Sequence, residues 1–212
     1  MLVTFTPGVP AAVDSLARPR HALPRAHLRE LAMMKLLRPP LGPDDHIRGE
    51  LTRPLQLVEF GDYECPLCGQ AYLVIGALER ALGDRLCVGF RNFPLTAAHP
   101  YAQIAAEAAE AAGAQGKFWL MHDLLMTHQD ALDVPHLGEY AQKLGLDMFR
   151  FVDDLQAHRF ADKIRADRRS GALSGVSATP TFFVQGRKHT GPWDFDSLYA
   201  ALTGEPLART GC

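Results

Sequence analysis

Two cysteines separated by two residues are the most chemically distinctive feature of this 212-residue sequence. They are Cys65 and Cys68, in the tetrapeptide Cys-Pro-Leu-Cys, and they follow an apolar run, Leu55 to Phe60, that breaks at Gly61. The residues from Gln70 to Leu82 then carry apolar side chains at helical spacing. A helix N-terminus presents unpaired N–H groups and a partial positive charge, and both favour a thiolate over a thiol. The pattern therefore predicts a reactive cysteine pair that carries out thiol–disulfide exchange.

A cysteine pair can also be a structural bridge or half of a zinc site. Structural zinc takes four ligands, commonly from two such pairs. The other two cysteines do not form a second pair, because Cys87 lies in an apolar run and Cys212 ends the sequence. In a reducing cytosol a CxxC pair is more often catalytic or metal-binding than a structural bridge. Redox chemistry is therefore the favoured hypothesis, and we expect neither a metal nor a cofactor.

Composition argues against several other functions. The formal net charge is −2 and hydrophobic residues make up 47% of the chain, so no overall basic field indicates binding to nucleic acid or to an anionic membrane. No apolar run approaches the roughly 20 residues of a membrane span. A secretory apolar segment is also lacking, because Pro7, Pro10 and Asp14 interrupt each candidate. We therefore expect a cytoplasmic protein that has no membrane span and binds no nucleic acid.

Composition also divides the chain into parts. Residues 1–53 are rich in Pro and Arg, which predicts a leader that is disordered or loosely docked. A globular domain is expected over residues 54–206, with a helical insertion at about 96–174, and residues 207–212 form a tail.

Hydrophobic periodicity predicts the order of elements within the domain. A strand at 55–60, a helix at 66–82 and a strand at 85–93 form a β-α-β unit, which normally has parallel strands and a right-handed crossover. Apolar side chains at helical spacing then predict a block of helices at about 101–112, 118–125, 137–144, 148–155 and 158–172. Two short strands, at 181–184 and 188–190, and a helix at 195–202 follow. We therefore predict an α/β fold with a mixed sheet of about four strands and an all-helical insertion.

This order of elements, together with several sequence segments, resembles the DsbA-like branch of the thioredoxin superfamily. The similarity runs from about Asp45 to Leu202. Its specific segments are Val58 to Cys68, Phe90 to Leu95 with His99-Pro100, Gln115 to Trp119, and Gly175 to Gly186. A lone CxxC would be weak evidence, but a Cys-Pro-x-Cys after a strand combined with a distant Thr-Pro-Thr before a hairpin is specific. The subgroup that the chain resembles is the DsbA-like thioredoxin domains that occur alone or fused to sodium/proton antiporters.

The resemblance implies a role for each residue of the site. Cys65 would be the nucleophile and Cys68 the resolving thiol. Thr179-Pro180 matches the position of the superfamily's cis-proline, where the Thr179 backbone would pair with an extended substrate segment. Pro66 and Leu67, between the two cysteines, would tune the reduction potential and contact substrate.

Glu59 lies in the strand before the cysteines, where relatives carry a buried acidic residue beneath the disulfide. Burial raises the pKa of a carboxyl group, which would suit Glu59 to shuttle a proton to or from Cys68. The alternative is that Glu59 points to solvent and takes no part in the reaction.

The neighbouring side chains predict a nucleophile of moderate acidity. Leu67 cannot donate a side-chain hydrogen bond or a positive charge to the Cys65 thiolate, and Asp62 and Glu64 would oppose the thiolate if they lie nearby. We therefore expect the pKa of Cys65 at about 6 to 7, one to two units below that of free Cys. His99 is expected to cap or pack rather than to take part in chemistry.

Together these residues predict a protein-disulfide oxidoreductase that, in the cytosol, is a reductase or isomerase rather than an oxidant. Its partners would be protein or peptide disulfides and dithiols, and a thiol or disulfide reductase would supply or accept electrons. Two alternatives stay open. One is a redox-sensing or peptide-binding module of thioredoxin type. The other is a glutathione-dependent transferase or isomerase on the same fold, although those relatives usually replace the second cysteine and Cys68 is present.

Overall fold

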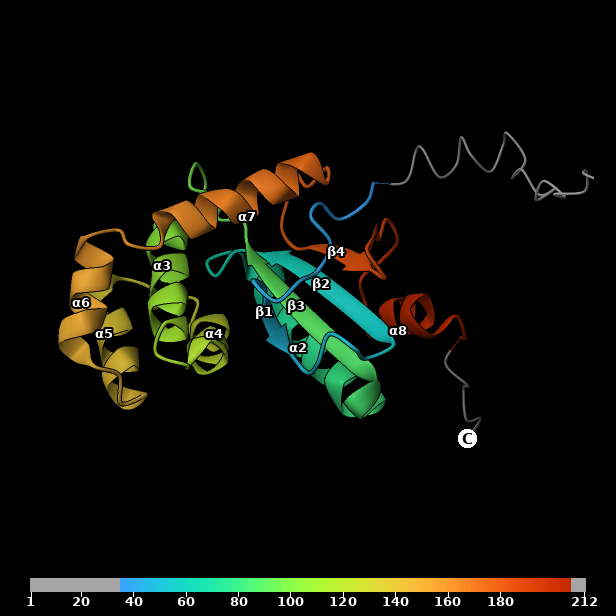
Figure 1. The fold of residues 1–212 in the computed structure, drawn as a ribbon, viewed down its shortest axis with the longest axis horizontal. Coiled ribbons are helices and arrows are strands. Elements are labelled where there is room, and N and C mark those ends of the chain that lie inside the picture. Colours follow the sequence, from blue (N-terminus) through green and yellow to red (C-terminus); the bar gives the residue numbers. More distant parts are fainter. Residues whose placement is uncertain (1–34, 207–212) are drawn as a thin grey trace, which may run out of the picture. The chain divides into compact units, whose positions relative to one another are not determined.

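The computed structural model describes residues 35–206, in which five strands form one mixed sheet (Figure 1). The strands are β1 (His46–Arg48), β2 (Leu55–Gly61), β3 (Leu86–Asn92), β4 (Thr181–Val184) and β5 (Arg187–Lys188). Their spatial order is β1-β3-β2-β4-β5. β2 and β3 are parallel, and each other neighbouring pair is antiparallel. The predicted α/β class and its mixed sheet are confirmed, with one strand more than expected.

The helices confirm the predicted order. They are α2 (Pro66–Leu82), α3 (Ala102–Gly113), α4 (Phe118–Thr127), α5 (Val134–Lys143), α6 (Met148–Gln156), α7 (Ala161–Leu173) and α8 (Phe195–Thr203), with a 3-10 turn η1 at Gly83–Arg85. α3 to α6 group together beside the sheet, and α7 runs from that group back over β3 (Figure 1). Each helix in the described part of the chain is too short or too polar to span a bilayer.

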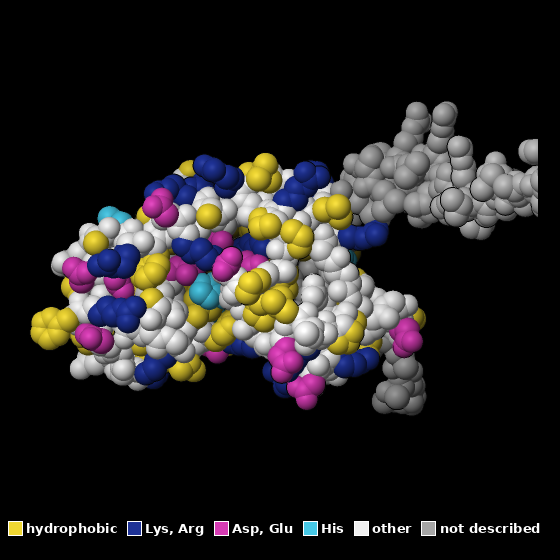
Figure 2. Space-filling view, in the orientation of Figure 1, with side chains coloured by type: hydrophobic (Ala, Val, Ile, Leu, Met, Phe, Trp, Pro, Cys, Tyr) yellow, Lys and Arg dark blue, Asp and Glu magenta, His cyan; other side chains and the backbone are white. Residues whose placement is uncertain are grey.

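The two faces of the sheet pack against different partners. Successive residues of a strand point to opposite faces, so Leu57 joins the core beneath α2 and α8 while Val58 joins the core on the other face. A third core fills the helical insertion, and it includes Cys65 and Cys68. The cysteine pair therefore lies where the sheet meets the insertion. On the face drawn in Figure 2, hydrophobic side chains are scattered among charges of both signs.

Buried polar side chains tie the insertion to the end of β3. Asn92 donates a hydrogen bond of 2.6 Å from Nδ2 to Oε1 of Glu110 on α3, and its backbone N–H donates to Asp167 on α7. The other oxygen of Glu110 lies 2.8 Å from His46 Nε2 on β1. Because an unpaired buried charge is costly, these contacts restrict how α3 and α7 can sit against the sheet.

The segment before Pro54 differs from the expected leader. β1 pairs antiparallel with β3 at the sheet edge, and Leu37 is buried in the core. Asp45 receives two hydrogen bonds, of 2.7 and 2.8 Å, from the buried Arg91 of β3. β1 was not predicted, because a strand of three residues with one apolar side chain is too short to show a periodic pattern. Residues 1–34 of the expected leader and the tail 207–212 lie outside the described residues.

Removal of the Asp45 carboxylate is expected to destabilise the domain. The Asp45→Ala variant leaves the Arg91 guanidinium buried without its anion, which should lower the free energy of unfolding by about 3 kcal/mol. Denaturant unfolding followed by circular dichroism measures the change. The control is Asp44→Ala, since Asp44 is exposed. Equal stabilities for the two variants would show that Asp45 does not tie this segment to the sheet.

Candidate active site

The loop that carries the cysteines begins where β2 ends. Gly61 lies so close to the Phe90 ring of β3 that a Cβ at this position would collide with it, so only glycine fits. The chain then turns, with Cys65 N–H donating to Asp62 O, and Cys65 becomes the N-cap of α2. Pro66 occupies the first turn of the helix, where a missing N–H costs nothing. The predicted placement of Cys65 at a helix N-terminus is therefore found.

The two thiols have opposite acidities. Cys65 is only 6% exposed, yet the Cys68 thiol donates a hydrogen bond to its thiolate, and this contact lowers the pKa of Cys65 to about 5. Burial opposes the shift, while the backbone N–H groups of Cys68 and Leu67 add to it. The same hydrogen bond, together with full burial, raises the pKa of Cys68. Cys65 is thus a ready nucleophile at neutral pH, and Cys68 holds its proton.

The pKa of Cys65 lies below the 6 to 7 expected from its neighbours, and the two carboxylates explain why. Asp62 is buried and pairs at 2.8 Å with His99 Nδ1, so its negative charge is compensated. Glu64 accepts a hydrogen bond from the backbone N–H of Tyr101. Leu67 contributes through its backbone N–H rather than its side chain. Sequence reasoning counted the charges but could not see their partners.

Glu59 is buried beneath the cysteines, so the alternative in which it points to solvent is wrong. Glu59 is only 2% exposed. Burial raises the pKa of its carboxyl group to about 8, and the negative charge of Cys65 is the second cause of the increase. Contact with Cys68 acts in the opposite direction. One carboxyl oxygen, Oε1, has no hydrogen-bond partner among the described residues. A buried polar atom without a partner is expected either to bind a water molecule or to have a role in function.

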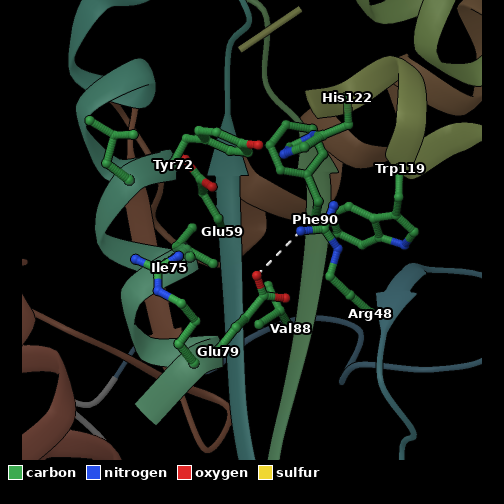
Figure 3. A pocket seen from close by; sticks show the side chains of 12 residues that line it. Arg48, Glu59, Tyr72, Ile75, Glu79, Val88, Phe90, Trp119 and His122 are labelled. Carbon is green, nitrogen blue, oxygen red and sulfur yellow. Dashed lines mark hydrogen bonds and ion pairs between the residues drawn. The ribbon is translucent and has the colours of Figure 1, made fainter. Parts of the chain in front are cut away.

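A cavity of about 490 Å³ lies beside Glu59 (Figure 3). α2 contributes Tyr72 and Glu79, and α4 contributes Trp119 and His122. Arg48 of β1 closes one side through ion pairs with Glu79 at 3.2 Å and with Asp123 at 2.7 Å. The cavity therefore connects the buried carboxyl to a polar rim on the side of α2 and β1.

The distant Thr179-Pro180 segment meets the cysteines at this site. The Thr179–Pro180 peptide is cis. Cys65 Sγ lies 3.5 Å from the backbone carbonyl oxygen of Thr179, which immediately precedes β4. Leu67 is 47% exposed beside the pair. The structure thus brings together the residues that the sequence placed far apart.

Sequence reasoning missed three residues that join the cysteine loop to the insertion, namely Tyr63 of the loop and His122 and Gln129 of the insertion. Gln129 donates from Nε2 to the carbonyl oxygens of Tyr63 and Cys65, at 2.9 and 2.8 Å. The buried Tyr63 hydroxyl lies 3.1 Å from Nδ1 of His122, whose pKa burial lowers to about 3. The sequence around Gln129 contains no motif that would predict its contacts with the cysteine loop. Within residues 35–206, no group of three or more His, Cys, Asp or Glu is arranged to hold a metal ion.

Comparisons with known proteins cover most of the chain. A family model described as thioredoxin matches residues 42–203. The "Na(+)/H(+) antiporter NhaA 3" of Salinispora tropica is 50% identical over 166 residues, which are 77% of this chain and 25% of that protein. The "Na(+)/H(+) antiporter NhaA 1" of Mycobacterium sp. (strain KMS) is 44% identical over 171 residues, 80% of this chain and 28% of that protein. The chain thus spans about a quarter of the length of these curated relatives.

Solved structures share the fold. A thioredoxin-like oxidoreductase from Silicibacter pomeroyi has a TM-score of 0.67 at 26% identity and covers 76% of this chain and 91% of that one. Oxidised BdbD from Bacillus subtilis has a TM-score of 0.66 at 23% identity, covering 74% of this chain and 90% of that one.

A matched pair of variants tests the origin of the low pKa of Cys65. Cys68→Ala removes the hydrogen-bond donor and should raise the pKa of Cys65 by about one unit, equivalent to roughly 1.4 kcal/mol. Cys68→Ser keeps an O–H donor and should leave most of the shift in place. Thiolate absorbance at ultraviolet wavelengths, titrated between pH 3 and pH 9, measures both. Identical pKa values in the two variants would assign the shift to the helix N-terminus instead.

Proposed function

Because the chain belongs to the thioredoxin family, we propose that it is a DsbA-like protein-disulfide oxidoreductase that acts through the Cys65–Cys68 dithiol. One observation carries the proposal: Cys65 is a thiolate at neutral pH while its neighbour Cys68 keeps its proton. A structural cysteine pair has no need of this asymmetry, whereas an exchange reaction requires one attacking thiolate and one thiol in reserve.

In the reductive direction, Cys65 and Cys68 act in turn. The Cys65 thiolate attacks one sulfur of a substrate disulfide, and the other substrate sulfur leaves as a thiolate. Cys68 then loses its proton and attacks the Cys65 sulfur of the mixed disulfide. The second substrate sulfur leaves, the substrate has gained two electrons, and the protein holds a Cys65–Cys68 disulfide. The reverse sequence oxidises a substrate dithiol.

Glu59 is the base that we assign to the second step. While Cys65 is a thiolate, its charge helps to raise the pKa of Glu59 to about 8, so the carboxyl is mostly protonated at pH 7. Formation of the mixed disulfide removes the Cys65 charge, and the pKa of Glu59 must fall. Glu59 can then release its proton toward the cavity and accept the proton of Cys68. The cavity offers this route, because Glu59 lines it together with the polar side chains of Arg48 and Glu79 (Figure 3).

Substrate would contact four residues around the sulfur of Cys65. Leu67 is exposed next to it and offers an apolar contact, and Pro66 lies between the two cysteines. The Thr179 backbone lies beside the sulfur and can pair with an extended substrate segment, in the manner of an added strand. Pro180 follows it and completes the wall. These contacts suit an unfolded or extended polypeptide better than a folded one.

We place the reaction in the cytoplasm, with a thiol or disulfide reductase as electron partner. Stabilisation of the Cys65 thiolate favours the reduced dithiol, so the reduction potential should lie between about −270 mV for thioredoxin and about −120 mV for DsbA. A pKa of about 5 is likewise between the values of about 7 and 3.5 for those two proteins. A pair of intermediate potential in a reducing compartment would act as a reductase or isomerase.

A redox-sensing or peptide-binding module is the second candidate. It is favoured by the curated relatives, which are named as antiporters and of which this chain spans about a quarter. In such a module the cysteine pair would change a partner's activity rather than turn over substrates. A glutathione-dependent transferase is less well supported, because Cys68 is present and contacts Cys65.

Insulin reduction distinguishes the enzyme from the module. With dithiothreitol as reductant, the protein should accelerate insulin precipitation, and Cys65→Ser should abolish the acceleration because no nucleophile remains. Cys87→Ser is the control, since Cys87 is buried in β3. Absence of turnover, together with stable capture of one partner by Cys68→Ser, would reject the enzyme and support the module.

Glu59→Gln tests the base. The resolving step, measured as release of a mixed disulfide, should depend on pH in the wild-type protein and slow by about 10²-fold at pH 7 in Glu59→Gln, with loss of that dependence. Glu79→Gln is the control, because Glu79 lines the same cavity but pairs with Arg48. An unchanged rate and pH profile in Glu59→Gln would remove Glu59 from the mechanism.

A second pair of variants tests the proton route through the cavity. Gly76 on α2 lines the cavity, and a Cβ there would have Arg80 Nη1 at 3.5 Å as its nearest neighbour. Gly76→Phe should therefore fill the cavity and slow the resolving step, whereas Gly76→Ala should leave it open. Equal resolving rates for the two variants would mean that the proton leaves by another path.

A further inference from the structure

A histidine lies beside the cysteine loop, and the proposed mechanism does not use it. His99 belongs to the segment after β3, and three hydrogen bonds join that segment to the loop. Leu95 N–H and His99 Nδ1 each lie 2.8 Å from Asp62 Oδ2. The backbone N–H of Tyr101 donates to Glu64, the residue before Cys65, at 2.6 Å. These bonds fix the segment that carries His99 against Asp62 and Glu64, which immediately precede Cys65 in the loop.

Asp62 fixes both the orientation and the charge of the His99 ring. The Asp62 side chain is fully buried, and its carboxylate also accepts a hydrogen bond from Glu64 N–H at 2.9 Å. A buried carboxylate holds Nδ1 of the imidazole as a donor and leaves Nε2 as the nitrogen that can face outward. The His99 side chain is 20% exposed, so the ring is not sealed in the interior.

The three negative groups that act most strongly on His99 favour its protonated form. The pKa of His99 is raised, first by the hydrogen bond that its ring donates to Asp62 and then by the negative charges of Asp62, Cys65 and Glu64, while burial opposes the shift. Three hydrogen-bond donors share the Asp62 charge. The Cys65 thiolate receives no positive charge from its own tetrapeptide, because Leu67 occupies the position between Pro66 and Cys68.

We propose that His99, held by Asp62, is the cation that stabilises the Cys65 thiolate, and that it is a positioning residue that sets the strength of this dithiol as an oxidant. The consequence for redox chemistry rests on the proposed function. His99 acts through its charge, and no proton or electron passes through it. A cation beside the thiolate stabilises the reduced dithiol and so makes the Cys65–Cys68 disulfide easier to reduce.

The coupling must be reciprocal. If protonated His99 lowers the pKa of Cys65, the Cys65 thiolate raises the pKa of His99 by the same amount. The two titrations are separate, because the pKa of Cys65 is about 5 and that of His99 is raised from its ordinary value. Each group is therefore charged throughout the titration of the other, and each effect can be measured alone.

Two titrations on the full chain test the proposal. In Cys65→Ala, NMR should show the pKa of His99 lowered by about 0.5 to 1 unit, and in His99→Gln, thiolate absorbance should show the pKa of Cys65 raised by the same amount. The His99 signal is assigned by its absence from His99→Gln. A tenfold loss of thiolate stabilisation makes the potential of the pair about 30 mV more negative. High salt should reduce both shifts.

His136→Gln is the matched control. His136 pairs with Asp133 at 2.7 Å through Nδ1, as His99 pairs with Asp62, but it lies in the first turn of α5. This variant should leave the pKa of Cys65 and the potential unchanged.

An unchanged pKa of His99 in Cys65→Ala would overturn the proposal and leave His99 as a residue that only anchors the loop. This measurement does not alter His99 or its contacts, so it stands even if His99→Gln does not fold. Neither titration needs a substrate. If the pKa values of His99 and Cys65 are coupled but the protein does not reduce insulin, the proposed enzymatic function is rejected. The electrostatic interaction between His99 and Cys65 is then still supported.

Discussion

The site depends on one negative charge held in a nearly closed space. The Cys65 sulfur must be a thiolate to react, yet burial alone would raise the pKa of Cys65. The Cys68 thiol supplies the largest compensation, a hydrogen bond with Thr179 supplies the next, and the N–H groups at the start of α2 add to them. The position of β2, the turn after Gly61 and the first turn of the helix all follow from the need to aim these donors at one atom.

The same charge governs the groups beneath it. Glu59 is held protonated in part because Cys65 is charged, and Cys68 keeps its proton because Cys65 accepts its hydrogen bond. The three groups therefore titrate as a set rather than one by one. Loss of the Cys65 charge on formation of a mixed disulfide removes the reason for both neighbours to stay protonated. Electrostatics alone can thus order the two steps of exchange, with Cys68 activated only after Cys65 has reacted.

Much of the fold followed from local patterns, because apolar periodicity and the break at Gly61 are properties of short segments. The cysteine pair could also be placed, since it directly follows the end of β2, whereas the burial of Glu59 was expected only from the resemblance to relatives. The short strand β1 could not be predicted. It is a strand because it pairs with β3, and its own residues carry no strand pattern. The pKa of Cys65 was set too high for a similar reason. The partners of Asp62 and Glu64 come from a segment more than thirty residues away, at His99 and Tyr101.

The helical insertion is part of the site as well as its wall. Gln129, which follows α4, donates to the carbonyl oxygen of Cys65, the same oxygen that accepts from the N–H groups of Cys68 and Gly69 at the start of α2. Gly69 has no side chain because a Cβ there would collide with the Gln129 amide. A larger residue at position 69 would occupy the space of the Gln129 amide, and glycine leaves that space free for it. A displacement of α4 would therefore move the N-terminus of α2 and the thiolate with it.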